Sequence, residues 1–167
     1  MTLYTTVDSP LGELLLVGER SGTAKDGIVL ASLSLPGQKG GAVVQDGWRR
    51  DDAAFTGTAD QLQAYFSGAT DRFDIEHTTR GTDFQRRVWA ALDAIPHGTT
   101  TSYKHIAEQA GSPAAVRAVG TAIGANPLLI VRPCHRVIGS NGALGGYAGG
   151  VAAKQRLLTH EGAAPMA

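Results

Sequence analysis

Short runs in which apolar and polar residues alternate predict strands in the first half of the chain. Residues 3–7 alternate weakly, and the apolar-rich runs 13–17 and 28–35 predict a second and a third strand. The turn residues 8–12 join the first two into a hairpin, and the glycine-rich stretch 36–47 predicts a surface loop. Helical spacing at 60–66, closed by Gly68, predicts one helix, and 73–75 is expected to return as a strand.

From residue 82 onward, apolar residues recur at the three- and four-residue spacing of helices. The first predicted helix, capped by Gly81 or Thr82, buries the apolar side chains Phe84, Val88, Trp89, Leu92 and Ile95. A second helix over 103–110 ends at a glycine, and a third over 114–123 begins after the cap Ser112. Two short helices joined by a turn with glycine predict a helix-turn-helix.

The last third of the chain predicts a wing and a closing helix. The apolar residues 128–131 predict a short buried strand. Residues 137–138 and 143–144 flank an Asn-Gly pair and predict a hairpin, which would be the wing. The glycine-rich loop 145–150 lacks the spacing and the lysine of a phosphate-binding loop, which excludes nucleotide binding, and 151–159 predicts the final helix.

Composition argues against a membrane protein and favours a reducing compartment. With 43% hydrophobic residues the chain can bury a core, yet no run reaches the roughly 18 apolar residues of a membrane span. The N-terminus lacks the basic and apolar segments of a signal peptide, and the chain has a single cysteine. We therefore expect a cytoplasmic protein without a membrane partner.

Charge is distributed unevenly although the net charge is zero. Residues 1–76 carry six Lys or Arg against eleven Asp or Glu, a net charge of −5. Residues 77–167 carry nine Lys or Arg against four Asp or Glu, a net charge of +5. A basic half allows one face to meet DNA or RNA, and chance drift between two domains is the alternative explanation.

Cys134 is the only cysteine in 167 residues. A lone thiol forms neither an intramolecular disulfide nor a cysteine-rich metal site, so it is either an inert buried thiol or an activated nucleophile. Its neighbours favour the nucleophile, because His135 can act as a base and Arg136 adds the positive potential that favours a thiolate.

A carboxylate near the end of the last helix completes a plausible relay. The helix dipole does not favour Glu161 at that position, so we expect another reason for it. Glu161 would fix the tautomer of His135, and His135 would take the proton of Cys134 directly or through a water. Adjacent residues on an extended chain point apart, which favours the water.

The third predicted helix is built almost entirely of small residues around Arg117. Small side chains allow close approach to another surface. That surface is either another helix of the protein or a narrow groove of a nucleic acid, into which Arg117 would project.

Five motifs carry a family resemblance. They are residues 133–137 (PCHRV), 117–120 (RAVG), 126–127 (NP), 147–150 (YAGG) and Glu161. In this order and spacing, residues 82–162 resemble the O6-alkylguanine-DNA alkyltransferases, which are suicide repair proteins for alkylated DNA.

The resemblance implies an α+β fold in two domains. Residues 1–76 would form a ribonuclease H-like domain of a small antiparallel sheet and a helix, and 77–81 a linker. Residues 82–167 would form a winged helix-turn-helix domain that binds DNA and carries the active site. The protein would be a monomer that binds double-stranded DNA in the minor groove with the alkylguanine flipped out.

The resemblance also implies the reaction. The Cys134 thiolate would attack the alkyl carbon on guanine O6, and also on O4 of alkylated thymine, and would keep the group as a thioether. One molecule repairs one lesion, without a cofactor or a metal. The catalytic set would be Cys134, His135 and Glu161, with Asn126 bracing the turn that carries the cysteine.

Substrate-binding roles follow residue by residue from the same resemblance. The set is Tyr103, Val137, Tyr147, Ala148 and Gly149. Tyr103 would donate its hydroxyl toward N3 of the flipped guanine, and the backbone at Val137 and Cys134 would read the exocyclic amine. The amide of Ala148 would bond O6, and the ring of Tyr147 would wall the pocket.

DNA contacts are implied for Arg117, Ala118, Gly120 and Tyr103. Arg117 would fill the vacated stack and pair with the orphaned base. Ala118 and Gly120 would lie in the minor groove, where sequence readout is degenerate.

The chain departs from the family in three places. Some relatives hold zinc in the N-terminal domain, whereas this half has no cysteine and only His77 at its boundary, so we expect no zinc. Arg132 stands where an apolar residue is expected, and it could snorkel to solvent, perturb the pocket mouth or lower the pKa of Cys134. Ala148 stands where some members have Ser.

Two other functions compete with alkyl transfer. A winged-helix lesion sensor would bind damaged DNA without transfer, but family-like sensors lack the cysteine. A cysteine hydrolase would turn over many times, but it has no need of Arg117 on a helix of small residues.

Overall fold

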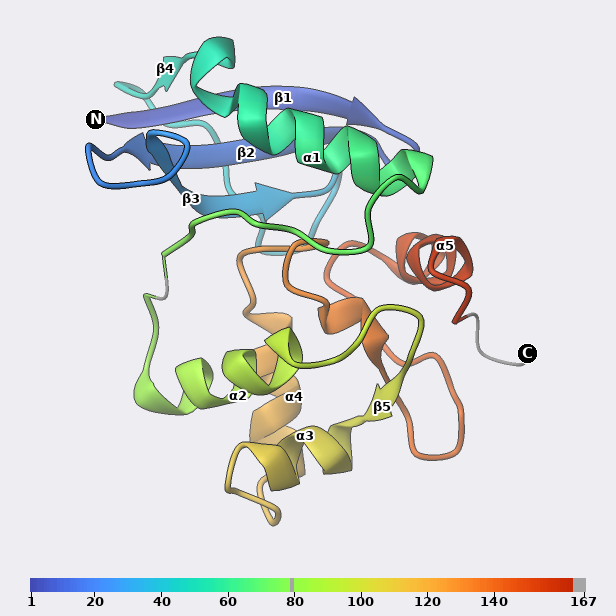
Figure 1. Ribbon diagram of the computed structural model, residues 1–167. Helices are drawn as coiled ribbons and strands as arrows, with labels where there is room; N and C mark the ends of the chain where they lie inside the picture. Colours follow the sequence, from blue (N-terminus) through green and yellow to red (C-terminus); the bar gives the residue numbers. More distant parts are fainter. Residues whose placement is uncertain (79, 164–167) are drawn as a thin grey trace. The chain divides into compact units, whose positions relative to one another are not determined.

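The computed structural model describes residues 1–78 and 80–163, and its contacts divide the chain into two compact units, Met1–Thr78 and Thr79–Ala167. Thr79, within the predicted linker, lies outside the described residues. Figure 1 shows a sheet in the first unit and mainly helices in the second, which is an α+β fold.

The first unit is a four-stranded sheet with the order β3-β2-β1-β4. The strands are β1 (Thr2–Ser9), β2 (Gly12–Arg20), β3 (Ile28–Ser34) and β4 (Arg49–Arg50). The first three pair antiparallel, including the hairpin of β1 and β2 that the turn at 8–12 predicts, and β4 joins β1 in parallel. The 3-10 helix η1 (Asp52–Phe55) leads into α1 (Thr56–Ser67), which lies along the sheet and buries Leu62 and Tyr65 (Figure 1). The apolar face of the sheet and this helix form the core.

The strand predicted at 73–75 is wrong. Among the described residues after α1, an isolated bridge between Leu30 and His77 continues the sheet, two residues beyond the predicted strand. The side chain of Gln61 takes the place of a neighbouring strand: its amide donates to the Asp74 carbonyl at 2.9 Å, and its oxygen accepts from the Asp74 N–H at 2.7 Å. β4 was not predicted, because two exposed arginines carry no apolar pattern.

The second unit contains four α-helices among its described residues. They are α2 (Asp83–Asp93), α3 (Tyr103–Gln109), α4 (Val116–Gly124) and α5 (Val151–His160). Thr82 caps α2 in a reciprocal capping box with Gln85, and Ser102 caps α3. α2, α3 and α4 pack on one another through Val88, Ile106 and Val119. The predicted helix-turn-helix is thus present as α3 and α4.

α4 begins two residues later than predicted. Ser112 does not cap it; the Ala115 N–H bonds the Ser112 carbonyl at 2.9 Å, so residues 112–115 form a turn before the helix.

The predicted hairpin at 137–144 is also wrong. Its turn exists, because the Gly142 N–H bonds the Gly139 carbonyl at 2.9 Å, but residues 143–144 are not a strand. Instead β6 (Val137–Ile138) pairs in parallel with β5 (Thr101–Ser102), just before α3. This pairing fixes the segment that follows Cys134 against the start of α3.

Candidate active site

A tight turn at residues 128–132 replaces the predicted buried strand. The Arg132 N–H bonds the Leu128 carbonyl at 3.0 Å, and Ile130 has a φ of 69°. The side chain of Asn126 closes the turn: its oxygen accepts from the Leu128 N–H at 3.0 Å, and its amide donates to the Leu128 carbonyl at 3.2 Å. Leu128, Leu129 and Ile130 are buried, as predicted, but in a turn, and Val131 is partly exposed.

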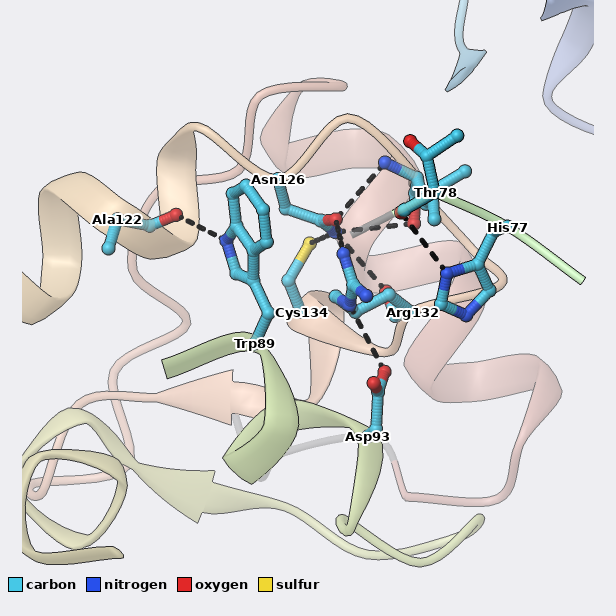
Figure 2. A network of polar contacts seen from close by, with 9 residues as sticks. His77, Thr78, Trp89, Asp93, Ala122, Asn126, Arg132 and Cys134 are labelled. Carbon is cyan, nitrogen blue, oxygen red and sulfur yellow. Dashed lines mark hydrogen bonds and ion pairs between the residues drawn. The ribbon is translucent and has the colours of Figure 1, made fainter. Parts of the chain in front are cut away.

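Cys134 begins the 3-10 helix η2 (Cys134–Arg136) directly after this turn. Its side chain is buried, and the Asn126 amide nitrogen lies 3.3 Å from the sulfur (Figure 2). Asn126 therefore contacts both the turn and the thiol, which is the position that the resemblance implies.

The environment of Cys134 keeps its thiol protonated in the free protein. Burial raises the pKa of Cys134 to about 11, although the Asn126 amide and the charges of Lys154 and Arg132 each lower it. Arg136, which we expected to favour the thiolate, points elsewhere: its guanidinium forks onto Glu161, with nitrogen–oxygen distances of 2.7 and 2.9 Å. Thiolate formation at neutral pH therefore requires a base.

His135 and Glu161 are in contact, as predicted. His135 Nε2 lies 2.9 Å from Glu161 Oε2, and both side chains are fully buried. Burial lowers the pKa of His135, so the ring is neutral at neutral pH. A neutral ring beside a carboxylate donates from Nε2, which leaves Nδ1 without a proton. Nδ1 is buried and has no hydrogen-bond partner among the described residues, so it can accept a proton.

Lys154 is a site residue that the sequence analysis missed. It is fully buried on α5, and its ammonium donates to the Val137 carbonyl at 2.6 Å and to the Gly146 carbonyl at 3.1 Å. Burial lowers the pKa of Lys154 to about 8. Its position three and four residues before the buried Leu157 and Leu158 was the available signal.

The predicted pocket residues approach the cysteine from α3 and from the glycine-rich loop. Tyr103 is the first residue of α3, and its pKa is raised by burial and by the nearness of Cys134. A Cβ atom added to Gly145 would lie 3.0 Å from the Tyr103 hydroxyl, so the loop passes over this tyrosine. The Tyr147 ring meets the His135 ring edge-on, with centroids 6.5 Å apart. Ala148 and Gly149 follow in the loop and are partly exposed.

The small-residue face of α4 is directed outward. The helix buries Val119, Ala122 and Ile123, whereas Arg117 and Ala118 are exposed. A Cβ atom added at Gly120 would meet nothing within 4 Å. The small residues of this face were explained either by packing on another helix of the protein or by contact with a groove of a nucleic acid. Packing on another helix within the described residues is not supported.

Only part of the basic surplus lies at the surface. Arg132, Arg136 and Lys154 are buried and bonded, so they do not face a polyanion. Arg86, Arg87, Lys104, Arg117 and Arg156 are exposed. Residues 1–78 and 80–163 contain neither a group of three or more metal-ligand side chains nor a helix with the length and hydropathy needed to cross a bilayer.

Family models and individual relatives both match this chain to one family of DNA methyltransferases. Residues 2–78 match the 6-O-methylguanine DNA methyltransferase, ribonuclease-like domain, and 83–163 match the 6-O-methylguanine DNA methyltransferase, DNA binding domain. A methylated-DNA–protein-cysteine methyltransferase of Mycobacterium tuberculosis (H37Rv) is 49% identical over 161 residues, which is 96% of this chain and 93% of that protein. One from Methanosarcina acetivorans is 42% identical over 159 residues, 95% of this chain and 97% of that protein.

Among solved structures, Mycobacterium tuberculosis OGT in complex with DNA is similar to this chain. The TM-score is 0.84 at 48% sequence identity, and the match covers 96% of this chain and 92% of that chain.

The buried group around Glu161 yields a stability prediction. Glu161→Gln leaves Arg136 buried without a counter-charge, so we expect the free energy of unfolding in urea to fall by about 3–5 kcal/mol. Arg156→Gln, an exposed change on α5, whose last residue precedes Glu161, serves as the control and should stay within about 0.5 kcal/mol of the parent. A loss no larger than the control's would contradict the importance of this pair.

Proposed function

The chain belongs to the 6-O-methylguanine DNA methyltransferase family, and from this premise we propose that it repairs DNA by moving an alkyl group from guanine O6 to Cys134. The observation that carries the proposal is a buried thiol held by Asn126 next to a neutral imidazole that Glu161 orients. O4 of alkylated thymine is a second acceptable donor in this proposal.

The first step is proton transfer. Nδ1 of His135 takes the proton of Cys134 through a bridging water, and the Glu161 carboxylate stabilises the imidazolium that forms. The Arg136 guanidinium donates to both Glu161 oxygens and so compensates the negative charge of this buried carboxylate. The Asn126 amide and the Lys154 ammonium stabilise the thiolate.

The second step is displacement at saturated carbon. The sulfur forms a bond to the alkyl carbon as the carbon–oxygen bond breaks, and the electron pair of that bond passes to the guanine. The hydroxyl of Tyr103 donates toward N3 and so helps the guanine leave. Since the thioether that remains has no route back to a thiol, each molecule reacts once.

The pocket reads the base with backbone groups and one ring. The carbonyls of Val137 and Cys134 accept from the exocyclic amine. The Val137 carbonyl also accepts from Lys154, but a carbonyl oxygen has two lone pairs, so both bonds can form. The amide of Ala148 bonds O6, with Gly149 allowing the loop to approach closely, and Tyr147 covers the ring.

Double-stranded DNA is the proposed partner, bound through α4. The target atom lies inside the duplex, so the nucleotide must be extruded at a cost of a few kcal/mol. Arg117 fills the vacated position, and Ala118 and Gly120 let the helix lie in the minor groove. The exposed Arg86, Arg87 and Lys104 are the candidate phosphate contacts.

The experiment that tests the proposal is intact mass spectrometry after incubation with a duplex that contains O6-methylguanine. We expect a gain of one CH₂ unit, mapped to Cys134 and saturating at one per chain, and no gain in Cys134→Ser. A duplex that is bound without any mass gain indicates a lesion sensor instead. Release of product beyond one equivalent indicates a hydrolase.

Arg117→Ala should slow transfer from duplex DNA by about tenfold or more, because no side chain then fills the position that the extruded base vacates. Transfer from a single strand, where the base is already unstacked, should change much less. Single-turnover rates on both substrates measure this, and Arg156→Ala is the control for loss of one exposed cation. An equal fall on both substrates would contradict the role in extrusion.

The relay predicts a flat pH dependence of transfer around neutrality. Between the lowered pKa of His135 and the Cys134 pKa of about 11, moving a proton from thiol to imidazole does not change the total number of bound protons. The single-turnover rate should therefore be constant near pH 7 and fall below the ordinary histidine pKa of about 6.5. It should also decline above the Lys154 pKa of about 8, where the ammonium that stabilises the thiolate loses its charge. A rate that rises about tenfold per pH unit through neutrality would instead mean that free hydroxide removes the proton.

A further inference from the structure

Arg132 is a buried cation that the proposed reaction does not use. It is 2% exposed, and it lies two residues before Cys134 at a position where an apolar side chain was expected. Of the earlier options, snorkelling to solvent is excluded by this burial. A guanidinium is unfavourable inside a protein unless charge and hydrogen bonds compensate it, so its partners indicate its role.

The partners of Arg132 come from α2 and from the Asn126 turn. Its Nε donates to Asp93 Oδ1 at 3.1 Å, and its guanidinium lies over the Trp89 ring, 5.1 Å from the centroid. The Trp89 indole donates in turn to the Ala122 carbonyl at 2.9 Å, which ties the ring to α4. Figure 2 shows this chain of contacts continuing to Asn126 and the sulfur of Cys134.

The contact with Asn126 fixes which way its amide points. A guanidinium nitrogen of Arg132 lies 3.3 Å from Asn126 Oδ1, which also accepts from the Leu128 N–H. Two donors on one side exclude the flipped amide, because its NH₂ group would then face them. The NH₂ group is therefore directed to the Leu128 carbonyl and to Cys134 Sγ.

Arg132 also adds charge to the surroundings of the thiol. The charged groups that lower the pKa of Cys134 are Lys154 from α5 and Arg132. Two further titratable groups lie near it: Tyr103 from α3, whose pKa is raised by burial and by Cys134, and His135, the next residue of η2. Asp93 acts through Arg132, because it neutralises part of that cation from a half-exposed position.

We propose that Arg132 is a positioning residue for the alkyl transfer: it holds the Asn126 amide toward Cys134 and supplies positive charge to the thiolate, and Asp93 limits how much of that charge the thiolate experiences. This inference rests on the proposed function of Cys134. It assigns a role in the reaction to α2, which carries Asp93 and Trp89.

The test compares two substitutions with opposite electrostatic effects. Arg132→Met keeps a long side chain but removes the cation and the bond to Asn126, so the thiolate becomes less stable. Asp93→Asn removes the counter-charge but keeps the cation, so the thiolate becomes more stable. Because Cys134 is the only cysteine, one ¹³Cβ resonance of labelled cysteine reports the thiolate fraction at each pH.

We expect Arg132→Met to lower the thiolate fraction at a given alkaline pH and Asp93→Asn to raise it. A change of one unit in the thiol pKa changes the ratio of thiolate to thiol at a given pH by about tenfold. The single-turnover rate from the O6-methylguanine duplex should fall by about tenfold in Arg132→Met and should not fall in Asp93→Asn. Arg132→Lys should be intermediate, because a point charge does not hold Asp93 and Asn126 at once.

Each outcome decides the proposal. If both substitutions slow transfer while the cysteine titration is unchanged, Arg132 has only a structural role and the proposal is overturned. Should Arg132→Met fail to fold, Asp93→Asn, at the partly exposed partner, still supports or overturns the charge effect. A parent protein that transfers nothing refutes the proposed function, whereas the cysteine titration still tests the action of Arg132 on the thiol.

Discussion

The side chain of Asn126 makes the hydrogen bonds on which the active-site half depends. The turn at 128–132 buries peptide groups outside any of the strands β1 to β6, and such groups need partners. One amide bonds both the N–H and the carbonyl of Leu128 and still reaches the sulfur of Cys134. Backbone geometry and the surroundings of the thiol are therefore coupled, and a change that relaxes the turn also changes the nucleophile.

Burial and charge oppose each other at this site. Burial raises the pKa of Cys134 and lowers those of His135 and Lys154, so it disfavours every charged form that the proposed reaction uses. The compensation comes from hydrogen bonds that are already formed: Glu161 with His135 and Arg136, and Lys154 with two carbonyls. Partners fixed in advance do not have to reorganise when charge moves, which is how buried polar groups assist a reaction.

The sequence allowed the architecture to be predicted better than the local connections. Alternation and helical spacing located three strands and the helices, because both patterns record burial directly. Burial does not distinguish a strand from a turn, so the strand predicted at 128–131 was wrong. The hydrogen bonds from the Asn126 side chain to Leu128, which hydrophobic periodicity does not reveal, hold this segment as a turn. Cys134, His135 and Glu161 were candidates from their residue types and positions, and the motif resemblance added Asn126. Lys154 and the partners of Arg132 depend on contacts between distant elements that no local pattern reports.

The protonated state of Cys134 has a consequence for how long the protein survives unused. Oxidants and adventitious electrophiles react with thiolates far faster than with thiols, and access matters as well. A buried thiol with a pKa of about 11 presents almost no thiolate to peroxide in the absence of a substrate. In the proposed reaction the cysteine is used once, so this chemical inertness would preserve the thiol for an alkylated base.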